Sequence, residues 1–470
     1  MLTYSFQNLG SDSLYEHLYK CIKQDILEGK LTPGSKLPSK RTFAKNLGIS
    51  TITIENAYGQ LIAEGYLYSI PKKGFFVSDI NGYQSHKPII TSENINLTSG
   101  ESTYFADFTS NQTRVEIFPF ATWAKLMREV MSEHETALLT NPPCGGIFLL
   151  RQAIAQHLKD FRGLNISPEQ IIVGAGTEYL YGLLIQLLGF DKIYGVENPG
   201  YLKIHKIYQS NRVKSVPIEL DKSGMDLVSL NQSGADIIHL SPSHHFPTGI
   251  VTPISRRYEL LGWASQEENR YIIEDDYDSE FRLNGKPIPT LKSIDVMNKV
   301  IYMNTFTKSL ASTIRISYMV LPAHLANHFY QEMNFYSCTV SNFEQYTLAR
   351  FITEGYFEKH INRMRNYYHI QRDLLLEAIK KSPLSSHITI MEKDSGLHFL
   401  MQIHTTIAED DFIQLALQQG IKLSSLSQYY LGDYQGASNV YLINYSYLEP
   451  GHIEQAINRL YHLKGGSVHE

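Results

Sequence analysis

The sequence of 470 residues predicts an α/β protein of two domains, a small N-terminal one and a large α/β body. Three observations support this. Apolar residues recur at helical spacing within the first 79 residues. Residues 80–104 are polar and aperiodic, as expected of a tether. Short β-branched runs that end in polar or Gly-rich turns then recur along the remaining ~365 residues, a length that suits one large body.

Two helices open the predicted small domain. The first is amphipathic and ends at Gly29, because apolar residues recur at every fourth position: Leu14, Leu18, Ile22 and Ile26. After a turn, Ser39 is expected to cap a short helix over residues 40–47, which Gly48 closes.

A third helix and a hairpin complete this domain. Ser50 is the expected N-cap, Gly65 ends the helix, and the predicted core stripe is Ile54, Ala57, Tyr58, Leu61 and Ile62. Two short strands, 66–70 and 75–77, flank a tip of sequence Pro-Lys-Lys-Gly. Three helices and a β wing predict a winged helix-turn-helix whose third helix enters a DNA major groove.

Candidate DNA contacts follow from this geometry. The side chains expected at phosphates are Lys40, Arg41, Lys72 and Lys73, and those expected at base edges are Thr51, Ile52 and Thr53. Ile52 lies off the core stripe, so it packs either on a thymine methyl or under the wing. Residues 1–79 carry a net charge of only +2, so charge alone does not indicate nucleic acid.

In the body, Lys308 carries the most informative pattern. Thr305 stands three residues before it and Arg315 seven residues after it. An amine, a hydroxyl and a guanidinium at this spacing suit a cofactor with an aldehyde and a phosphate, because the amine can form a Schiff base. The alternative is a surface lysine in a Ser/Thr-rich loop.

A carboxylate cluster follows the apolar run at residues 272–273. We expect Asp275 to pair with a pyridine nitrogen and Tyr277 to reach the ring hydroxyl oxygen, at the carboxyl end of a parallel strand. The alternative is an acidic loop that binds a divalent cation or only solvent.

Two further turns predict the rest of the pocket. Gly176 and Thr177 follow an apolar strand and open a helix, so free N–H groups there can receive phosphate; the alternative is a tight packing turn. Tyr201 could stack on the pyridine face or be a core tyrosine. We expect residues 241–249 to form a wall of the same pocket, and the spacing around His244 and His245 does not support a metal site.

Residues 105–461 resemble the fold-type I aminotransferases that depend on pyridoxal phosphate. The resemblance implies that Lys308 carries the cofactor as the internal aldimine, that Asp275 binds the pyridine nitrogen, and that Tyr277 contacts the ring oxygen. It also implies that Tyr201 stacks on the ring. The phosphate cup would consist of Gly176, Thr177, Thr305 and Arg315.

The N-terminal domain resembles the GntR regulators through Leu37-Pro38-Ser39-Lys40-Arg41, Leu47-Gly48-Ile49-Ser50, Ala63-Glu64-Gly65-Tyr66-Leu67 and Gly74-Phe75-Phe76-Val77. Its union with an aminotransferase-like body resembles the MocR subfamily. The resemblance implies a transcription factor that binds pyridoxal phosphate and double-stranded DNA. It also implies a domain-swapped homodimer, in which each arm lies against the partner's body.

The expected organisation is a DNA-binding domain over 1–79, a linker over 80–104 and a cofactor-binding body over 105–470. The chain departs from the GntR pattern at Thr51, where many members carry arginine, and at Glu55, where many carry a basic residue. Three cysteines in separate segments, no signal-like N-terminus and no membrane-length apolar run indicate a cytoplasmic protein.

Two functions remain open on the sequence. The first is a regulator that senses an amine at Lys308, or pyridoxal phosphate itself. The second is an active aminotransferase with an accessory DNA-binding arm. Lys203 and Gln428 stand where the subfamily can supply arginines for a substrate carboxylate, which favours sensing, although a residual half-reaction is not excluded. A purely structural body would not need the pattern around Lys308.

Overall fold

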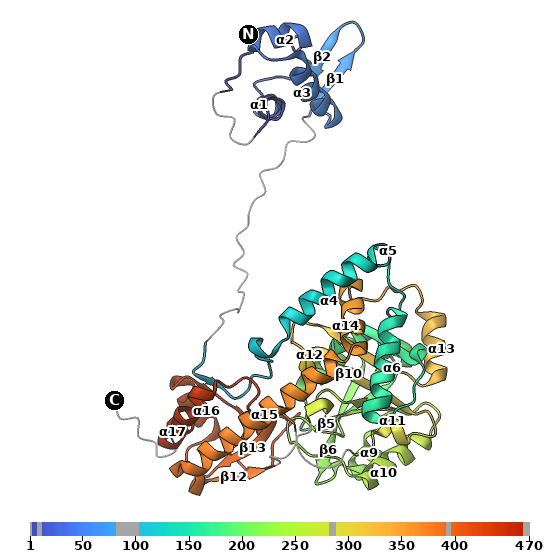
Figure 1. Cartoon of the computed structure of the whole chain (residues 1–470), viewed down its shortest axis with the longest axis vertical. Coiled ribbons are helices and arrows are strands. Elements are labelled where there is room, and N and C mark those ends of the chain that lie inside the picture. Colours follow the sequence, from blue (N-terminus) through green and yellow to red (C-terminus); the bar gives the residue numbers. More distant parts are fainter. Residues whose placement is uncertain (1, 7–11, 81–102, 282–287, 392–395, 464–470) are drawn as a thin grey trace. The chain divides into compact units, whose positions relative to one another are not determined.

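The computed structural model describes residues 2–6, 12–80, 103–281, 288–391 and 396–463. The chain forms two compact units, Met1–Glu101 and Ser102–Glu470 (Figure 1). Most of the predicted linker, residues 81–102, lies outside the described residues. Each unit is therefore treated by itself.

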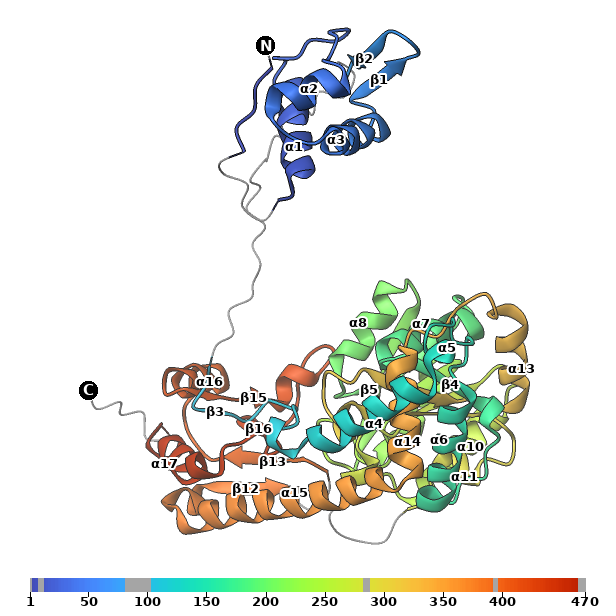
Figure 2. The ribbon, with the colours of Figure 1, turned by 45° about the horizontal axis from the view of Figure 1, so that its top comes forward.

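The N-terminal unit contains three helices and a hairpin: α1 (Leu14–Leu27), α2 (Lys40–Leu47), α3 (Thr51–Ala63), β1 (Leu67–Ile70) and β2 (Gly74–Val77) (Figure 2). The side chain of Ser39 accepts the N–H of Thr42, and that of Ser50 accepts the N–H of Thr53. These bonds satisfy backbone donors that a helix start leaves free.

One member of the predicted α3 stripe is wrong. Ile54, Ala57, Tyr58 and Leu61 are fully buried, whereas Ile62 is 36% exposed. At about 100° per residue, the buried stripe centres on the direction shared by Ile54 and Leu61, and Ile62 points to the edge of that stripe. Leu61 takes the buried direction.

An eight-stranded sheet forms the centre of the body, in the order β4-β11-β10-β9-β8-β5-β6-β7. Strand β11 runs antiparallel to both of its neighbours, and β5, β6, β8, β9 and β10 are mutually parallel. The strands are β4 (Ile171–Ala175), β5 (Ile193–Asn198), β6 (Lys214–Asp221), β7 (Gly224–Met225), β8 (Ile237–Leu240), β9 (Tyr271–Asp275), β10 (Val300–Thr305) and β11 (Ile316–Val320).

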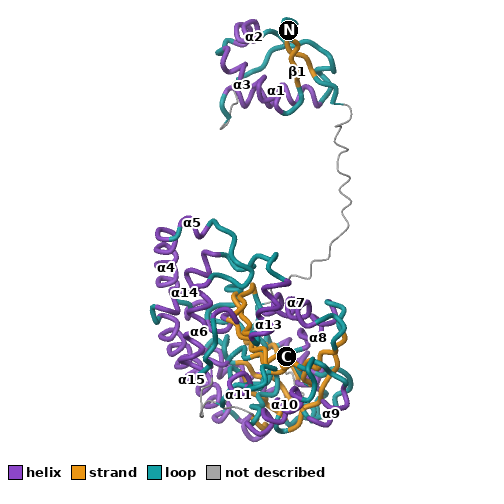
Figure 3. Tube along the Cα trace, turned by 90° about the vertical axis from the view of Figure 1, so that its right-hand side faces the viewer, coloured by secondary structure: helices purple, strands orange, loops and turns teal. Residues whose placement is uncertain are grey.

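Helices surround this sheet, so that the strands lie inside the body (Figure 3). Apolar faces of both layers meet in continuous clusters of buried side chains. The helices are α4 (Phe120–Glu133), α5 (Glu135–Leu138), α6 (Phe148–Arg162), α7 (Thr177–Leu188), α8 (Leu202–Ser210), α9 (Leu227–Ser233), α10 (Ile254–Ser265), α11 (Leu291–Ile294), α12 (Phe306–Ser309), α13 (Ala323–Glu332) and α14 (Asn342–Thr353).

A smaller C-terminal part contains an antiparallel sheet in the order β12-β13-β16-β15. The long helix α15 connects it with the large sheet (Figure 2). Its elements are α15 (Tyr356–Lys381), β12 (Ile388–Met391), β13 (His398–Ile403), α16 (Glu409–Gln418), β14 (Ile421–Lys422), β15 (Ser424–Ser425), β16 (Val440–Asn444) and α17 (Ile453–Leu463), with β14 paired to β3 (Ala106–Asp107). Among the described residues, no helix has the length and apolar character needed to cross a bilayer.

Candidate cofactor site and DNA-binding surface

The alternation of side chains along β9 decides which carboxylate enters the site. Successive strand residues point to opposite faces, so Asp275 faces one way while Glu274 and Asp276 face the other. Glu274 accepts the N–H groups of Leu291 and Lys292 at 2.8 and 2.9 Å and thereby caps the start of α11. Burial, as the largest cause, raises the pKa of Glu274 to about 7.

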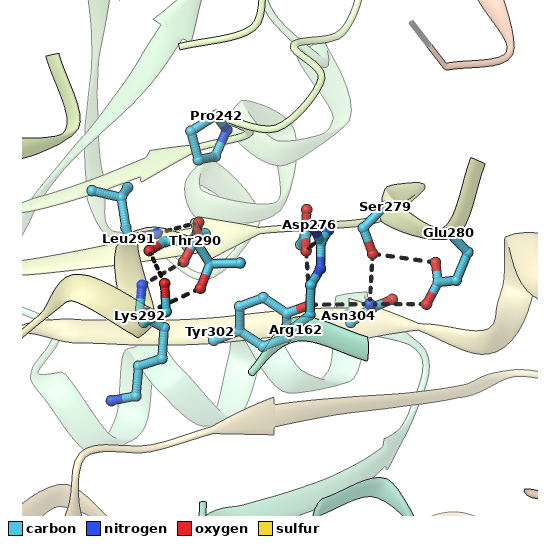
Figure 4. A network of polar contacts seen from close by, with 12 residues as sticks. Arg162, Pro242, Asp276, Ser279, Glu280, Thr290, Leu291, Lys292, Tyr302 and Asn304 are labelled. Atoms are coloured by element: carbon cyan, nitrogen blue, oxygen red, sulfur yellow. Dashed lines mark hydrogen bonds and ion pairs between the residues drawn. The ribbon is translucent and has the colours of Figure 1, made fainter. Parts of the chain in front are cut away.

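Asp276 belongs to the same polar layer behind the site (Figure 4). Its Oδ2 accepts a hydrogen bond from Tyr302 at 2.8 Å and pairs with Arg162 at 2.5 Å. The amide of Asn304 extends the layer to Glu280 at 3.4 Å. These contacts tie the end of β9 to β10 and α6 beneath the site, while Oδ1 of Asp276 and Nε of Arg162 have no hydrogen-bond partner among the described residues.

Asp275 is buried, and only one of its two carboxylate oxygens has partners. The hydroxyl of Tyr181, on α7, donates to its Oδ2 at 2.7 Å, and Nε2 of His239 lies 3.5 Å from the same oxygen. Burial and the Asp275 carboxylate raise the pKa of Tyr181 well above its usual value, so it remains a donor. Oδ1 of Asp275 has no hydrogen-bond partner among the residues that the structure describes.

Lys308 lies on the short helix α12, just beyond β10. Its Nζ donates to the backbone carbonyl of Asn111 at 2.7 Å. Burial lowers the pKa of this amine to about 8, although the carboxylate of Asp278 acts in the opposite direction. About a tenth of the amine is therefore unprotonated at pH 7, far more than for an ordinary lysine.

Arg315 and the start of α7 form a cationic corner of the site. Gly176 is the N-cap of α7 with φ of 92°, and a Cβ there would lie 2.7 Å from Nη2 of Arg315. Only glycine lets the guanidinium approach this backbone so closely. The hydroxyl of Thr305 lies nearby in the lining and is bonded to Ser317 at 2.8 Å.

Aromatic and imidazole side chains form the remaining wall. The hydroxyl of Tyr277 lies 3.3 Å from Nδ1 of His244, which also contacts Asp278 at 2.6 Å. Tyr201 is half exposed and meets Phe246 edge-on, with ring centroids 5.8 Å apart. An exposed tyrosine with one free face can receive a ring, whereas a core tyrosine cannot.

Most of these groups line one cavity of about 440 Å³, whereas His244 and Asp278 lie outside its lining. It brings together every cofactor residue expected from the sequence, and Lys203: Gly176, Thr177, Tyr201, Lys203, Asp275, Tyr277, Thr305, Lys308 and Arg315. Gln428 is not among the lining residues. It is exposed and accepts a hydrogen bond from Ser424, and its neighbour Tyr429 lines the cavity instead.

Sequence reasoning missed three groups of the site. Tyr181 lies four residues after Thr177, so the helical repeat places both on one face of α7, and this signal was available. Asn111 and His239 approach Lys308 and Asp275 from distant segments, and no local pattern indicates them.

The surface that the sequence predicts to face DNA contains an ion pair that the sequence did not predict. Nζ of Lys40 lies 2.6 Å from the carboxylate of Glu55. Glu55 on α3 is thus partly neutralised, and Lys40 is not free in this structure to meet a phosphate. Arg41 and Thr51 are exposed, Ile52 is 69% exposed, and Thr53 contributes its N–H to the Ser50 cap.

Lys72 and Lys73 are exposed at the tip of the hairpin, where Lys72 adopts a positive φ of 63°. A basic hairpin tip of this kind suits the wing of a DNA-binding domain. The assignment of individual DNA contacts stays a prediction.

Comparison with known proteins agrees with this architecture. Residues 14–77 match the family described as bacterial regulatory proteins, gntR family. Over 417 residues the chain is 38% identical to the HTH-type transcriptional regulator YdeL of Bacillus subtilis, covering 89% of this chain and 90% of the relative. It is 31% identical over 469 residues to the probable rhizopine catabolism regulatory protein MocR of Rhizobium meliloti, covering 95% and 93%.

The pyridoxine biosynthesis regulator PdxR of Corynebacterium glutamicum is 28% identical over 439 residues, covering 91% of this chain and 90% of the relative. Among solved structures, kynurenine aminotransferase of Pyrococcus horikoshii superposes with a TM-score of 0.67 at 23% identity, covering 79% of this chain and 93% of that one. This last likeness concerns the fold. The chain therefore belongs to the MocR-type transcriptional regulators of the GntR family, which join a winged helix-turn-helix to a fold-type I aminotransferase-like body.

Proposed function

We propose that this regulator binds pyridoxal phosphate in the cavity around Lys308 and that the bound ligand changes how the N-terminal unit engages DNA. The observation that carries the proposal is the presence, in one cavity, of a depressed-pKa amine and a buried carboxylate oxygen without a partner. When bound, pyridoxal phosphate supplies an aldehyde that condenses with a primary amine, releasing water, and a pyridinium that withdraws electrons.

The residues that line the cavity fit both the pyridine ring and the phosphate of this ligand. Oδ1 of Asp275 can accept the pyridinium N–H, and that bond would satisfy an atom that otherwise costs free energy when buried. Tyr181 holds the other oxygen of Asp275 in place. Arg315, with the bare backbone of Gly176 beside it, suits a phosphate at a helix start.

The remaining residues orient the ligand and exclude water. Tyr277 can donate to the ring hydroxyl oxygen, with His244 and Asp278 positioned behind it. The exposed face of Tyr201 can cover the pyridine ring. Lys308 holds its amine near the carbonyl of Asn111 until it reacts.

The lining also favours a sensor over an aminotransferase. Arg315 is the one arginine among the described residues that line the cavity, and it belongs to the phosphate corner. An amino-acid substrate would need a second guanidinium for bidentate recognition of its carboxylate. We infer that the effector is pyridoxal phosphate itself or a small amine that displaces Lys308, and that sustained turnover of amino acids is not the role of this body.

Large apolar side chains are exposed at the start of α4, just after α5 and at the start of α6. Phe120, Leu139 and Phe148 are 61%, 84% and 48% exposed there. Aromatic side chains are enriched at protein interfaces. We therefore propose a homodimer, in which one copy's DNA-binding arm lies against the other's body. Mass measurement in solution would test the dimer, and a monomer at micromolar concentration would contradict it.

The covalent link is tested by absorbance. Wild-type protein mixed with pyridoxal phosphate should develop a visible band, and Lys308→Ala should not. Lys206→Ala, at an exposed position on α8, is the matched control and should keep the band. A band that survives in Lys308→Ala would assign the chemistry to another amine.

A further inference from the structure

A carboxylate lies at the corner where the ligand's phosphate is expected. Oε1 of Glu178, in the first turn of α7, is 3.5 Å from Nη2 of Arg315 and also accepts a hydrogen bond from Nζ of Lys203 on α8. All three side chains line the cavity. Glu178 therefore bridges the two cations that would otherwise face an incoming anion.

The position of Glu178 places its carboxylate near the donors that would bind a phosphate. Only Thr177 separates it from Gly176, so Glu178 lies in the turn whose free N–H groups open α7. Those N–H groups, Arg315 and Lys203 are the donors that a phosphate would use. A carboxylate and a phosphate on the same donors repel each other, and the repulsion is larger for a dianionic phosphate than for a singly charged group.

The ion pairs that Glu178 makes with Arg315 and Lys203 can break easily. The side chains of Glu178, Arg315 and Lys203 are 42%, 48% and 48% exposed, and ion pairs so accessible to water contribute little stability. The hydrogen bond from Lys203 and the charges of both cations lower the pKa of Glu178, which keeps it ionised. The anion is thus present at neutral pH but is not locked in place.

We propose that Glu178 is a built-in competitor for the phosphate group of pyridoxal phosphate, and that it sets the affinity of the cavity low enough for the ligand to come and go. The inference rests on the proposed function, because it presupposes that this cavity receives a phosphorylated vitamer. It deepens that function by favouring pyridoxal phosphate itself as the effector, since a ligand that is permanently retained cannot report its own concentration.

The test compares two vitamers on the full-length protein. Glu178→Gln removes the charge and keeps the shape, so it should tighten equilibrium binding of pyridoxal phosphate about tenfold, or about 1.4 kcal/mol. Binding of pyridoxal, which lacks the phosphate, should stay within about twofold of wild type, because no like charges then meet. Glu332→Gln, at an exposed position on α13 outside the lining, is the matched control and should change neither affinity.

Two results would overturn the inference. Equal affinity of Glu178→Gln and wild type for pyridoxal phosphate would mean that the carboxylate does not compete. Weaker binding in Glu178→Gln would mean that it organises Arg315 instead. Unchanged pyridoxal binding verifies the fold of the variant, and Glu178→Ala, with a good helix former, repeats the test if Glu178→Gln is unstable. Absence of any visible band in wild type would instead contradict the proposed function.

Discussion

The lowered pKa of the Lys308 amine leads to a prediction about how fast it reacts with an aldehyde. Burial lowers the pKa of its amine from 10.5 to about 8. At about pH 7.5, roughly one quarter of the amine is then unprotonated, against about one in a thousand for an ordinary lysine. Only the unprotonated amine attacks an aldehyde, so the fraction of Lys308 that can react is about two hundred times that of a lysine of ordinary pKa, and its reaction should be correspondingly faster at this pH.

The assay is the rate at which the visible band grows after mixing with pyridoxal phosphate below saturation, measured between about pH 7 and 10. The second phosphate ionisation, near pH 6, is complete over this range. The rate should rise with a midpoint at about pH 8 and then level off. A lysine derivative free in solution should keep rising toward its own pKa of about 10.4.

Asp278 provides the internal check, because its carboxylate acts to raise the pKa of Lys308. Asp278→Asn should therefore shift the midpoint below that of wild type. The same shift has a consequence for folding: the unfolded state binds more protons than the folded state between about pH 8 and 10.5, so the contribution of Lys308 to stability rises with pH over that window. A midpoint near 10 in wild type would refute the assigned burial of the amine.

Three further substitutions test separate parts of the structure. Tyr181→Phe removes a buried hydrogen bond to Asp275 and should weaken pyridoxal phosphate binding by about tenfold or more; Tyr194→Phe, which removes a buried hydroxyl without a partner among the described residues, should not. Glu55→Gln should release Lys40 for a phosphate, raise DNA affinity and steepen its salt dependence by about one contact, and an unchanged slope would contradict this. Arg41→Ala should weaken binding to all DNA sequences alike and lower the salt slope by about one; if affinity and slope both persist, α2 is docked wrongly.

Local signals predict most of the fold and the positions of most residues that line the cavity. Ser39 and Ser50 cap their helices through bonds three residues away, which a sequence pattern can reveal. Asp275 was predictable because a carboxylate after a β-branched run emerges at the end of a buried parallel strand.

Long-range and conformational choices were not predictable in this way. The carbonyl that holds Lys308 belongs to Asn111, 197 residues away along the chain, and no periodicity encodes that approach. The pairing of Lys40 with Glu55 depends on rotamers of two flexible side chains across two helices. Gln428 was placed near the effector through an aromatic pair alone, and its neighbour Tyr429 lies in the cavity instead.

The central claim is that occupancy of the cavity around Lys308 is transmitted to the DNA-binding unit. Its most direct test is the affinity of the full-length protein for DNA from upstream of its own gene, measured with and without pyridoxal phosphate in wild type and in Lys308→Ala. The account predicts that the ligand changes wild-type affinity several-fold and leaves Lys308→Ala unaffected. Equal affinities in all four measurements, with the visible band present in wild type, would contradict it.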